Sequence, residues 1–239
     1  MRRRFFVDGV RNQQAEISGD DAKHLTRVLR VEPGQRYEIS DNRHVYLAEV
    51  SSARKEQVVF EVIEKLPPPV EGPNITLLAA LIKFDHFEWM IEKTTELGVT
   101  SIVPVIATRS EHGLEKAAHK RLDRWRKIAL EASQQARRAH LPAIEEPVDL
   151  SQAVERDATR RLALDEAGGT PLALAARGGA ETSALLVGPE GGWTDREREA
   201  FVRARWMSVS LGINILRAET AAISALAVVQ AEWLAKLEH

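Results

Sequence analysis

The chain has 239 residues, 44% of them hydrophobic and 28% charged, a composition typical of a globular protein with a buried core. Its formal net charge of −2 argues against a protein that coats nucleic acid by bulk attraction. The absence of cysteine excludes disulfides, thiolate zinc sites and cysteine nucleophiles in this chain. No apolar run appears long enough for a bilayer span, and the N-terminus lacks the apolar stretch of a signal peptide. We therefore expect a cytoplasmic protein without membrane contact.

The N-terminal part predicts a small β-barrel with one helix. Short β-type runs are found at residues 4–7, 36–40, 45–50 and 58–63, and a helical stretch lies near residues 20–29. Several short strands with one helix are typical of small barrels, many of which bind RNA. Fold alone does not assign that function.

A proline-rich segment separates this part from the rest of the chain. Four of the ten prolines lie in residues 65–74, which predicts a stiff linker between two domains. We assign residues 1–70 to the first domain and residues 75–239 to the second.

The second domain alternates predicted strands and helices. Compact apolar runs at 75–82, 99–107, 161–165, 184–187 and 208–211 predict buried parallel strands. This alternation is typical of an α/β fold, a mainly parallel sheet with helices on both faces. Ligands are then expected at the carboxyl ends of the strands.

Three helix starts can be predicted in this domain. Asp85 with Glu88 and Thr194 with Glu197 each have the spacing of a capping box. A long final helix is expected from about Thr220, a suitable N-cap residue, to residue 237.

Two segments that follow predicted strands carry the candidate chemistry. Residues 188–192 read Gly-Pro-Glu-Gly-Gly, a loop that lets the backbone approach a flat ligand closely. This loop lacks the lysine of a phosphate-binding loop, and a structural turn is the alternative interpretation. Residues 211–221 place Arg217, Glu219 and Thr220 beside the start of the last helix. An exposed ion pair is the commoner fate of such an arginine and glutamate.

Two local basic patches keep an RNA partner possible. Residues 1–30 carry seven Lys/Arg against four acids, and residues 116–138 carry eight against two. A solvated charged surface is the simpler interpretation of either patch alone, but the two together favour RNA.

The two C-terminal motifs resemble those of the SPOUT superfamily of knotted methyltransferases. More specifically, the chain is similar to the bacterial 16S ribosomal RNA uridine-N3-methyltransferase family. The similarity extends to Arg3–Val7, His24–Arg30, Glu92–Val99 and Arg109-Ser110, and from Arg124 to Gln135, so it spans nearly the whole chain. Ile213-Asn214 replaces the usual Pro-Arg of the family.

The resemblance implies a fold, a donor and an assembly. The N-terminal domain would be a PUA-like β-barrel that docks RNA. The C-terminal domain would be a SPOUT fold with a trefoil knot, which hydrophobic patterning cannot predict. S-adenosylmethionine would be the methyl donor, ribosomal RNA the partner, and the protein a homodimer whose active sites are completed by the partner chain.

The resemblance also implies the site residues. The donor would bind among three loops, through Leu164, Asp165, Val187, Gly188, Pro189, Glu190, Gly191, Gly192, Leu211, Gly212, Ile213, Ile215, Leu216 and Ala221. We expect RNA to be docked by Arg2, Arg3, Arg4, Arg27, Arg30, Arg109, Arg137 and Arg138.

The chemistry of the expected reaction suggests roles for Arg217 and Glu219. Uridine N3 carries a proton at neutral pH, so the enzyme must remove it or stabilise the resulting anion. Arg217 suits the second task because a guanidinium stays charged and presents fixed donors. Glu219 would hold Arg217 or act as the base, and we favour the holding role. A sulfonium methyl group is itself electrophilic, so no metal is expected. The alternatives are a SPOUT enzyme with another RNA target and a non-catalytic ribosome-assembly factor.

Overall fold

The chain divides into one unit of residues 1–70 with 133–141 and another of residues 71–132 with 142–239. The computed structural model describes residues 3–70 and 72–237. Arg2, a predicted RNA-binding residue, lies outside the described residues. Residues 133–141 were assigned to the second domain from the sequence, but they pack with the first unit.

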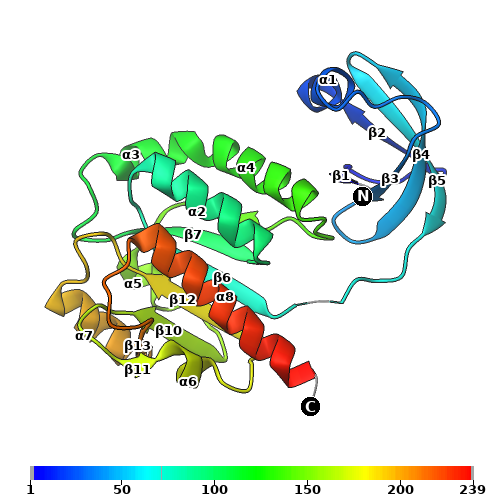
Figure 1. Ribbon diagram of the computed structural model, residues 1–239. Helices are drawn as coiled ribbons and strands as arrows, with labels where there is room; N and C mark the ends of the chain where they lie inside the picture. Colours follow the sequence, from blue (N-terminus) through cyan, green and yellow to red (C-terminus); the bar gives the residue numbers. More distant parts are fainter. Residues whose placement is uncertain (1–2, 71, 238–239) are drawn as a thin grey trace. The chain divides into compact units, whose positions relative to one another are not determined.

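The N-terminal unit is a five-stranded sheet with one helix (Figure 1). The sheet order is β1-β3-β4-β5-β2, with β1 parallel to β3 and the other pairs antiparallel. Its core includes Phe5, Ile39 and Phe60. The elements are β1 (Arg4–Phe6), β2 (Gln14–Ser18), α1 (Gly19–Arg27), β3 (Arg36–Ser40), β4 (Val45–Arg54) and β5 (Gln57–Lys65).

Strand β2 is missing from the sequence prediction, whereas the other four strands and the helix were expected. Its five residues include only two apolar ones, Ala15 and Ile17, and these two alone are buried. Alternation this short gives a weak strand signal.

Residues 133–141 are tied to this sheet by hydrogen bonds. The Ser40 hydroxyl donates to the carbonyl oxygen of Ala139 at 2.6 Å, and the backbone N–H of Leu141 donates to Asn42 Oδ1 at 2.7 Å. Ser40 is fully buried, so this bond satisfies a group that water cannot reach.

An arginine cluster strengthens the same junction. The Arg4 guanidinium donates to Glu38 Oε2 from Nε at 3.1 Å and from Nη2 at 2.7 Å, and its Nη1 donates to the Arg137 carbonyl at 2.6 Å. Arg137 Nη2 donates to Glu38 Oε1 at 2.6 Å. The Arg4 side chain is only 11% exposed. The charges of Arg4 and Arg137 thus hold this unit together, and their expected role in RNA docking stays a prediction.

The C-terminal unit is built on a parallel sheet of order β11-β13-β10-β12-β6-β7-β8, with β9 also paired to β7. All of these ladders are parallel, as the alternating pattern predicted. The strands are β6 (Asn74–Ala80), β7 (Ser101–Ile106), β8 (Ala143–Ile144), β9 (Val148–Asp149), β10 (Arg160–Leu164), β11 (Thr170–Pro171), β12 (Thr182–Val187) and β13 (Met207–Ser210). The helices are α2 (Phe84–Glu96), α3 (Leu114–Ala118), the 3-10 helix η1 (His119–Arg121), α4 (Leu122–Gln135), α5 (Leu150–Ala153), α6 (Leu172–Ala176), α7 (Asp195–Arg203) and α8 (Ala218–Leu237).

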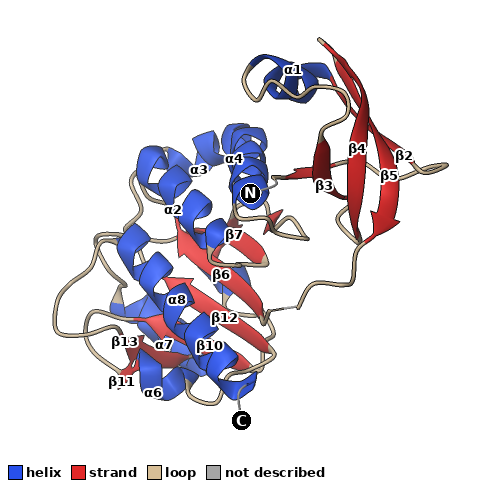
Figure 2. Ribbon diagram, turned by 45° about the vertical axis from the view of Figure 1, so that its right-hand side comes forward, coloured by secondary structure: helices blue, strands red, loops and turns tan. Residues whose placement is uncertain are grey.

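Each face of this sheet has its own hydrophobic core, because successive residues of a strand point to opposite faces. In β6, Ile75, Leu77 and Ala79 pack in the core that includes residues of α2, α4, α6 and α8, whereas Leu78 and Ala80 pack in the core that includes α5 and α7. Figure 2 shows helices on both faces of these strands.

All three predicted helices are present, but two of the three predicted N-cap residues are wrong. Helix α2 begins at Phe84 after an N-cap residue, Lys83, that makes no side-chain cap, so Asp85 lies inside the helix. Helix α8 begins at Ala218, which places Thr220 within its first turn. The capping box of α7 is confirmed, since Thr194 and Glu197 bond to each other's backbone N–H groups.

Helix α8 also corrects the expectation about apolar runs. It has 20 residues and a mean hydropathy of 1.2, enough to cross a bilayer by length and composition alone. The core helix of a soluble protein passes the same test. In α8, the side chains of Ala222, Ala225, Leu226 and Val229 are buried in the core beside the sheet. We therefore assign α8 to the packing of this unit.

Candidate active site

A cavity of about 240 Å³ lies at the carboxyl ends of β10, β12 and β13. These strands are neighbours in the order β13-β10-β12, and parallel strands bring their carboxyl ends to the same edge. The cavity is closed by the loop after each strand and by the first turn of α8. Thirteen of the fourteen predicted donor-binding residues line it, Gly191 being the exception. The cavity is further lined by Glu166, Gly168, Gly169, Trp193, Val209, Ser210, Asn214 and Ala218.

The loop at residues 188–192 is shaped by two glycines and a tryptophan. Gly192 has a φ of +67°, in the left-handed region, and its N–H donates to the Pro189 carbonyl at 2.9 Å. A Cβ at Gly188 would lie 2.9 Å from the Trp193 ring. The buried Trp193 indole donates to the Leu164 carbonyl at 2.9 Å. The glycines therefore let the loop fold against an indole that is bonded to the end of β10.

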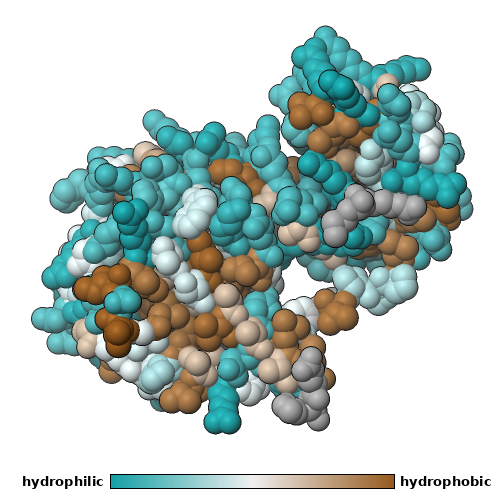
Figure 3. Space-filling view, viewed as in Figure 1, coloured by the Kyte–Doolittle hydropathy of each residue, from teal (hydrophilic) through white to brown (hydrophobic). Residues whose placement is uncertain are grey.

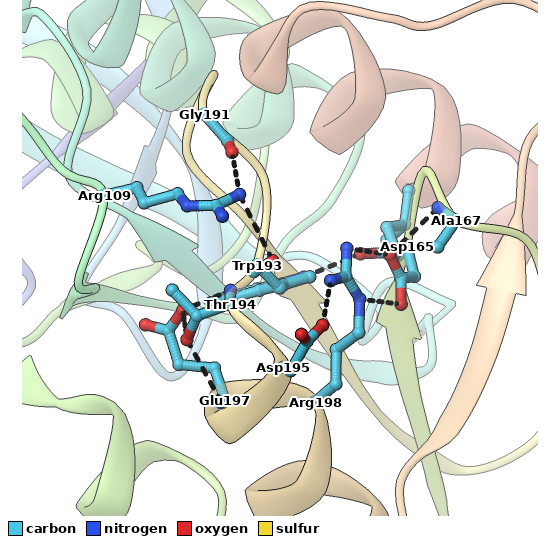
Figure 4. A network of polar contacts seen from close by, with 10 residues as sticks. Arg109, Asp165, Ala167, Gly191, Trp193, Thr194, Asp195, Glu197 and Arg198 are labelled. Atoms are coloured by element: carbon cyan, nitrogen blue, oxygen red, sulfur yellow. Dashed lines mark hydrogen bonds and ion pairs between the residues drawn. The ribbon is translucent and has the colours of Figure 1, made fainter.

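Gly191 faces Arg109 and does not line the cavity, so its predicted contact with the donor stays a prediction. Arg109 Nη1 donates to the Gly191 carbonyl at 2.7 Å, and a Cβ at Gly191 would lie 3.1 Å from the Arg109 Cβ. Arg109 was predicted to bind RNA. The structure gives its guanidinium a contact that supports the glycine loop from behind (Figure 4).

Asp165 is held at the cavity wall by Arg198 of α7. Arg198 donates from Nε to Asp165 Oδ2 at 2.9 Å and from Nη2 to Oδ1 at 3.0 Å, a two-pronged pairing that fixes the carboxylate plane. Figure 4 shows the Arg198 guanidinium between Asp165 and Asp195. Asp165 is 8% exposed, so this pairing offsets the cost of its burial. Sequence reasoning missed Arg198, because only the fold brings α7 against β10.

Glu197 joins the glycine loop to the segment after β7. Its Oε2 accepts the backbone N–H of Thr194 and its Oε1 accepts that of Thr108, both at 2.8 Å. Burial by itself would raise the pKa of Glu197, but the hydrogen bonds from Thr108 and Thr194 outweigh it, and the pKa is lowered. The carboxylate is thus held in its charged form.

The two predicted catalytic residues border this cavity without lining it. Arg217 directly precedes α8 and is exposed, and its side chain forms no ion pair with another described residue. Glu219 is 3% exposed, and its Oε1 lies 2.8 Å from His86 Nδ1 on α2. The expected contact between Glu219 and Arg217 is therefore replaced by one with His86. No motif marked His86, which comes close to Glu219 only through the packing of α2 on α8.

The segment before α8 exposes apolar side chains. Ile213 is 101% exposed and Ile215 is 80% exposed. Figure 3 shows apolar side chains gathered over this segment and along α8. Large exposed apolar patches commonly mark binding surfaces.

Sequence comparison assigns both parts of the chain. Residues 70–230 match the family model described as an RNA methyltransferase domain, and residues 17–63 match the one described as an RNA methyltransferase PUA domain. The chain belongs to this RNA methyltransferase family. Among the residues that the structure describes, no cluster of three His, Asp or Glu side chains suits a metal ion.

Relatives of this RNA methyltransferase match it along nearly its whole length. The ribosomal RNA small subunit methyltransferase E of Bacillus subtilis is 31% identical over 243 residues, with 95% of each chain covered. The corresponding enzyme of Neisseria gonorrhoeae, solved with bound S-adenosylmethionine, superposes with a TM-score of 0.89 at 29% identity, covering 98% of both chains. A Legionella pneumophila chain solved with the same cofactor gives a TM-score of 0.87 at 32% identity, covering 97% of this chain and 98% of that one. These similarities confirm the α/β fold with a PUA-like N-terminal domain.

The lowered pKa of Glu197 predicts a pH-dependent stability of this RNA methyltransferase. A depressed pKa in the folded state means that the carboxylate stabilises the protein above its ordinary pKa of 4.5, and that this contribution is lost as the pH falls through the folded-state value. We expect Glu197→Gln to lower the free energy of unfolding by about 1–3 kcal/mol at neutral pH, because one partly buried backbone N–H loses its charged acceptor. Urea unfolding at several pH values measures this difference, which should shrink below the ordinary pKa.

The matched control is Glu199→Gln on the same helix, whose side chain is 67% exposed and which should leave stability nearly unchanged. An equal loss for Glu197→Gln at every pH would contradict the assigned role of its charge.

Proposed function

We propose that this chain transfers a methyl group from S-adenosylmethionine to N3 of a uridine in the 16S ribosomal RNA of the small subunit. The observation that carries the proposal is the cavity at residues 164–169, 187–193 and 209–221, in a chain of the RNA methyltransferase family. Its support is the names of the relatives and the bound S-adenosylmethionine in the similar Neisseria and Legionella structures. The uridine N3 specificity rests on the resemblance along nearly the whole chain, in which the N-terminal match and the PUA-like domain favour the ribosomal uridine.

The chemistry of the cavity fits the donor. Its lining combines glycine backbone and apolar side chains, which suit an adenine ring, with the exposed carboxylates Glu166 and Glu190, which suit the cationic groups of the donor. When bound, the donor supplies an electrophilic methyl group on a sulfonium. The protein's part is to orient this group, keep its surroundings dry and accept the target base.

Arg217 is placed to serve the target base. It directly precedes the turn of α8 that closes the cavity, and its exposed guanidinium keeps its charge and its five donors. Such a group stabilises negative charge that develops on the carbonyl oxygens beside N3 as the proton leaves. We assign this role to Arg217.

RNA docking falls to the N-terminal unit in this proposal. Arg27 at the end of α1 is exposed, as are Arg30 and Arg3, and none of the three pairs with an acid among the described residues. Arg138 remains a candidate as well, since burial lowers its pKa only to about 10, which leaves it charged at neutral pH. Exposed cations such as Arg3, Arg27 and Arg30 displace counterions from a phosphate backbone.

The proposal extends to the topology and the assembly of the chain, both implied by the SPOUT resemblance. The trefoil knot is supported by the strand order, in which β13 and β12 lie on opposite sides of β10. A homodimer is supported by the exposed apolar side chains of Ile213, Ile215, Leu234 and Leu237, and a cytoplasmic location stays a prediction. A partner chain covering these side chains would remove them from water and lie next to the cavity.

The function is tested with small ribosomal subunits from cells that lack this gene. Incubation with the purified protein and S-adenosylmethionine should produce 3-methyluridine at one position of 16S RNA, as identified by mass spectrometry of nucleoside fragments. Arg217→Ala should lower the single-turnover rate by about 100-fold and leave donor affinity unchanged, because the lost group acts on the transition state. A methyl group on a ribose oxygen or only on transfer RNA would contradict the proposed target, and donor binding without any transfer would contradict catalysis.

RNA docking is tested by replacing Arg27 and Arg30 together with alanine. We expect weaker binding to small-subunit RNA. The salt dependence of the binding constant should also become shallower, by an amount that corresponds to about two lost phosphate contacts. Arg36→Ala is the control, since this arginine pairs with Glu49 at 2.9 Å on the same sheet and should change RNA affinity little. Unchanged affinity and salt dependence in the double variant would remove α1 from the docking surface.

A further inference from the structure

A buried carboxylate bonded to a half-exposed imidazole stands at the start of α8. Glu219 is 3% exposed, and its Oε1 lies 2.8 Å from Nδ1 of His86, whose side chain is 33% exposed. The other oxygen, Oε2, is buried without a hydrogen-bond partner among the described residues. A buried acceptor left unpaired costs free energy, so this arrangement calls for a reason other than stability.

The pair lies at the edge of the sheet that carries the cavity, next to residues that line it. Helix α2 follows β6, the neighbour of β12, and His86 is in its first turn. Glu219 is in the first turn of α8, between Ala218 and Ala221, which both line the cavity. Figure 1 shows α2 and α8 side by side.

The hydrogen bond sets which nitrogen of His86 is free. A carboxylate can only accept, so Nδ1 must carry the proton that Glu219 Oε1 receives. The unprotonated lone pair is then on Nε2. A buried carboxylate on one nitrogen and an accessible lone pair on the other is the arrangement that makes histidine a general base.

Two acidic side chains lie near the His86 ring. The titratable groups that the structure places against His86 are Glu219 on α8 and Asp85 on α2, whose Oδ2 lies 3.8 Å from Nε2. That distance is too long for a hydrogen bond, so it leaves Nε2 open to a substrate. An imidazolium formed in the reaction would lie between these two carboxylates.

The other acids near the cavity are less suited to accept a proton. Both oxygens of Asp165 are occupied by Arg198, and Glu166 and Glu190 are exposed to water. Arg217 stays protonated and cannot act as a base.

We propose that His86 is the catalytic base of the methyl transfer and that Glu219 is its positioning residue. The inference rests on the proposed function. His86 Nε2 takes the proton from uridine N3, and the electron pair of that N–H bond forms the new bond from N3 to the methyl carbon. The carbon–sulfur bond of the donor breaks with its electron pair going to sulfur, and the imidazolium later releases its proton to water.

The test compares His86→Asn and Glu219→Gln with the wild-type protein in single-turnover methyl transfer over a range of pH. The wild-type rate should rise with pH as the imidazole loses its proton and then level off. Both variants should be slower by about 100-fold or more at neutral pH, and their rates should keep rising with pH because hydroxide replaces the lost base. Affinity for S-adenosylmethionine, measured by calorimetry, should stay unchanged in both.

The matched control is His119→Asn. His119 Nδ1 lies 2.8 Å from Glu146 Oε2, the same distance as in the proposed pair, but the two side chains are 55% and 61% exposed. This variant should keep the wild-type rate and pH profile. An equal loss in this control would overturn the assignment to His86.

A modified substrate separates a base from a merely structural residue. Fluorine at C5 of uracil withdraws electrons and makes the N3 proton more acidic, so RNA containing 5-fluorouridine depends less on a base. It should restore much of the rate of His86→Asn and change the wild-type rate little. Equal effects on both proteins, or a wild-type rate and pH profile in His86→Asn, would overturn the inference and leave the proposed function intact. Failure of the wild-type protein to methylate either RNA would overturn both.

Discussion

The site depends on three loops meeting at one edge of a parallel sheet. Strands β13, β10 and β12 are neighbours, so segments more than twenty positions apart in the sequence end beside one another. Two contacts position the loop after β12. The Trp193 indole donates a hydrogen bond to the last residue of β10, and the Arg198 guanidinium pairs with Asp165, which directly follows β10. Both contacts join the segment after β12 to the end of β10. Without them the glycine loop would lack the rigid wall that a pre-formed ligand site needs.

The sequence pattern predicted the parts of this site that depend on local chemistry. Compact apolar runs indicated most of the strands, and Gly-Pro-Glu-Gly-Gly after one of them indicated a loop open to a ligand. The same reasoning failed where only the fold decides contacts. Nothing local distinguishes Gly192, which lines the cavity, from Gly191, which faces Arg109. Nothing in the sequence around His86 or Arg198 distinguishes either residue. Each gains its role because its helix packs against an element that is distant in the sequence.

The number of Lys and Arg residues in a patch predicts phosphate contacts less well than the burial and pairing of each side chain. Arg4 belongs to the basic N-terminal patch, yet Glu38 and the Arg137 carbonyl take up its donors. In the second basic patch, Arg124 forms a two-pronged pair with Glu88 at 2.7 Å for each bond. A net positive balance in the sequence therefore overstates the charge that is free to meet phosphate. The exposed arginines of α1 and its flank, which lack such partners among the described residues, are the better candidates for RNA contact.

The central claim is that the cavity among the three loops holds the methyl donor. The most direct measurement is a crystal structure of the protein with S-adenosylmethionine. We predict that the donor lies against the backbone of residues 188–192, with its sulfonium between this loop and the segment before α8. A donor bound outside residues 164–221, or these loops packed against each other with the donor excluded, would contradict the account.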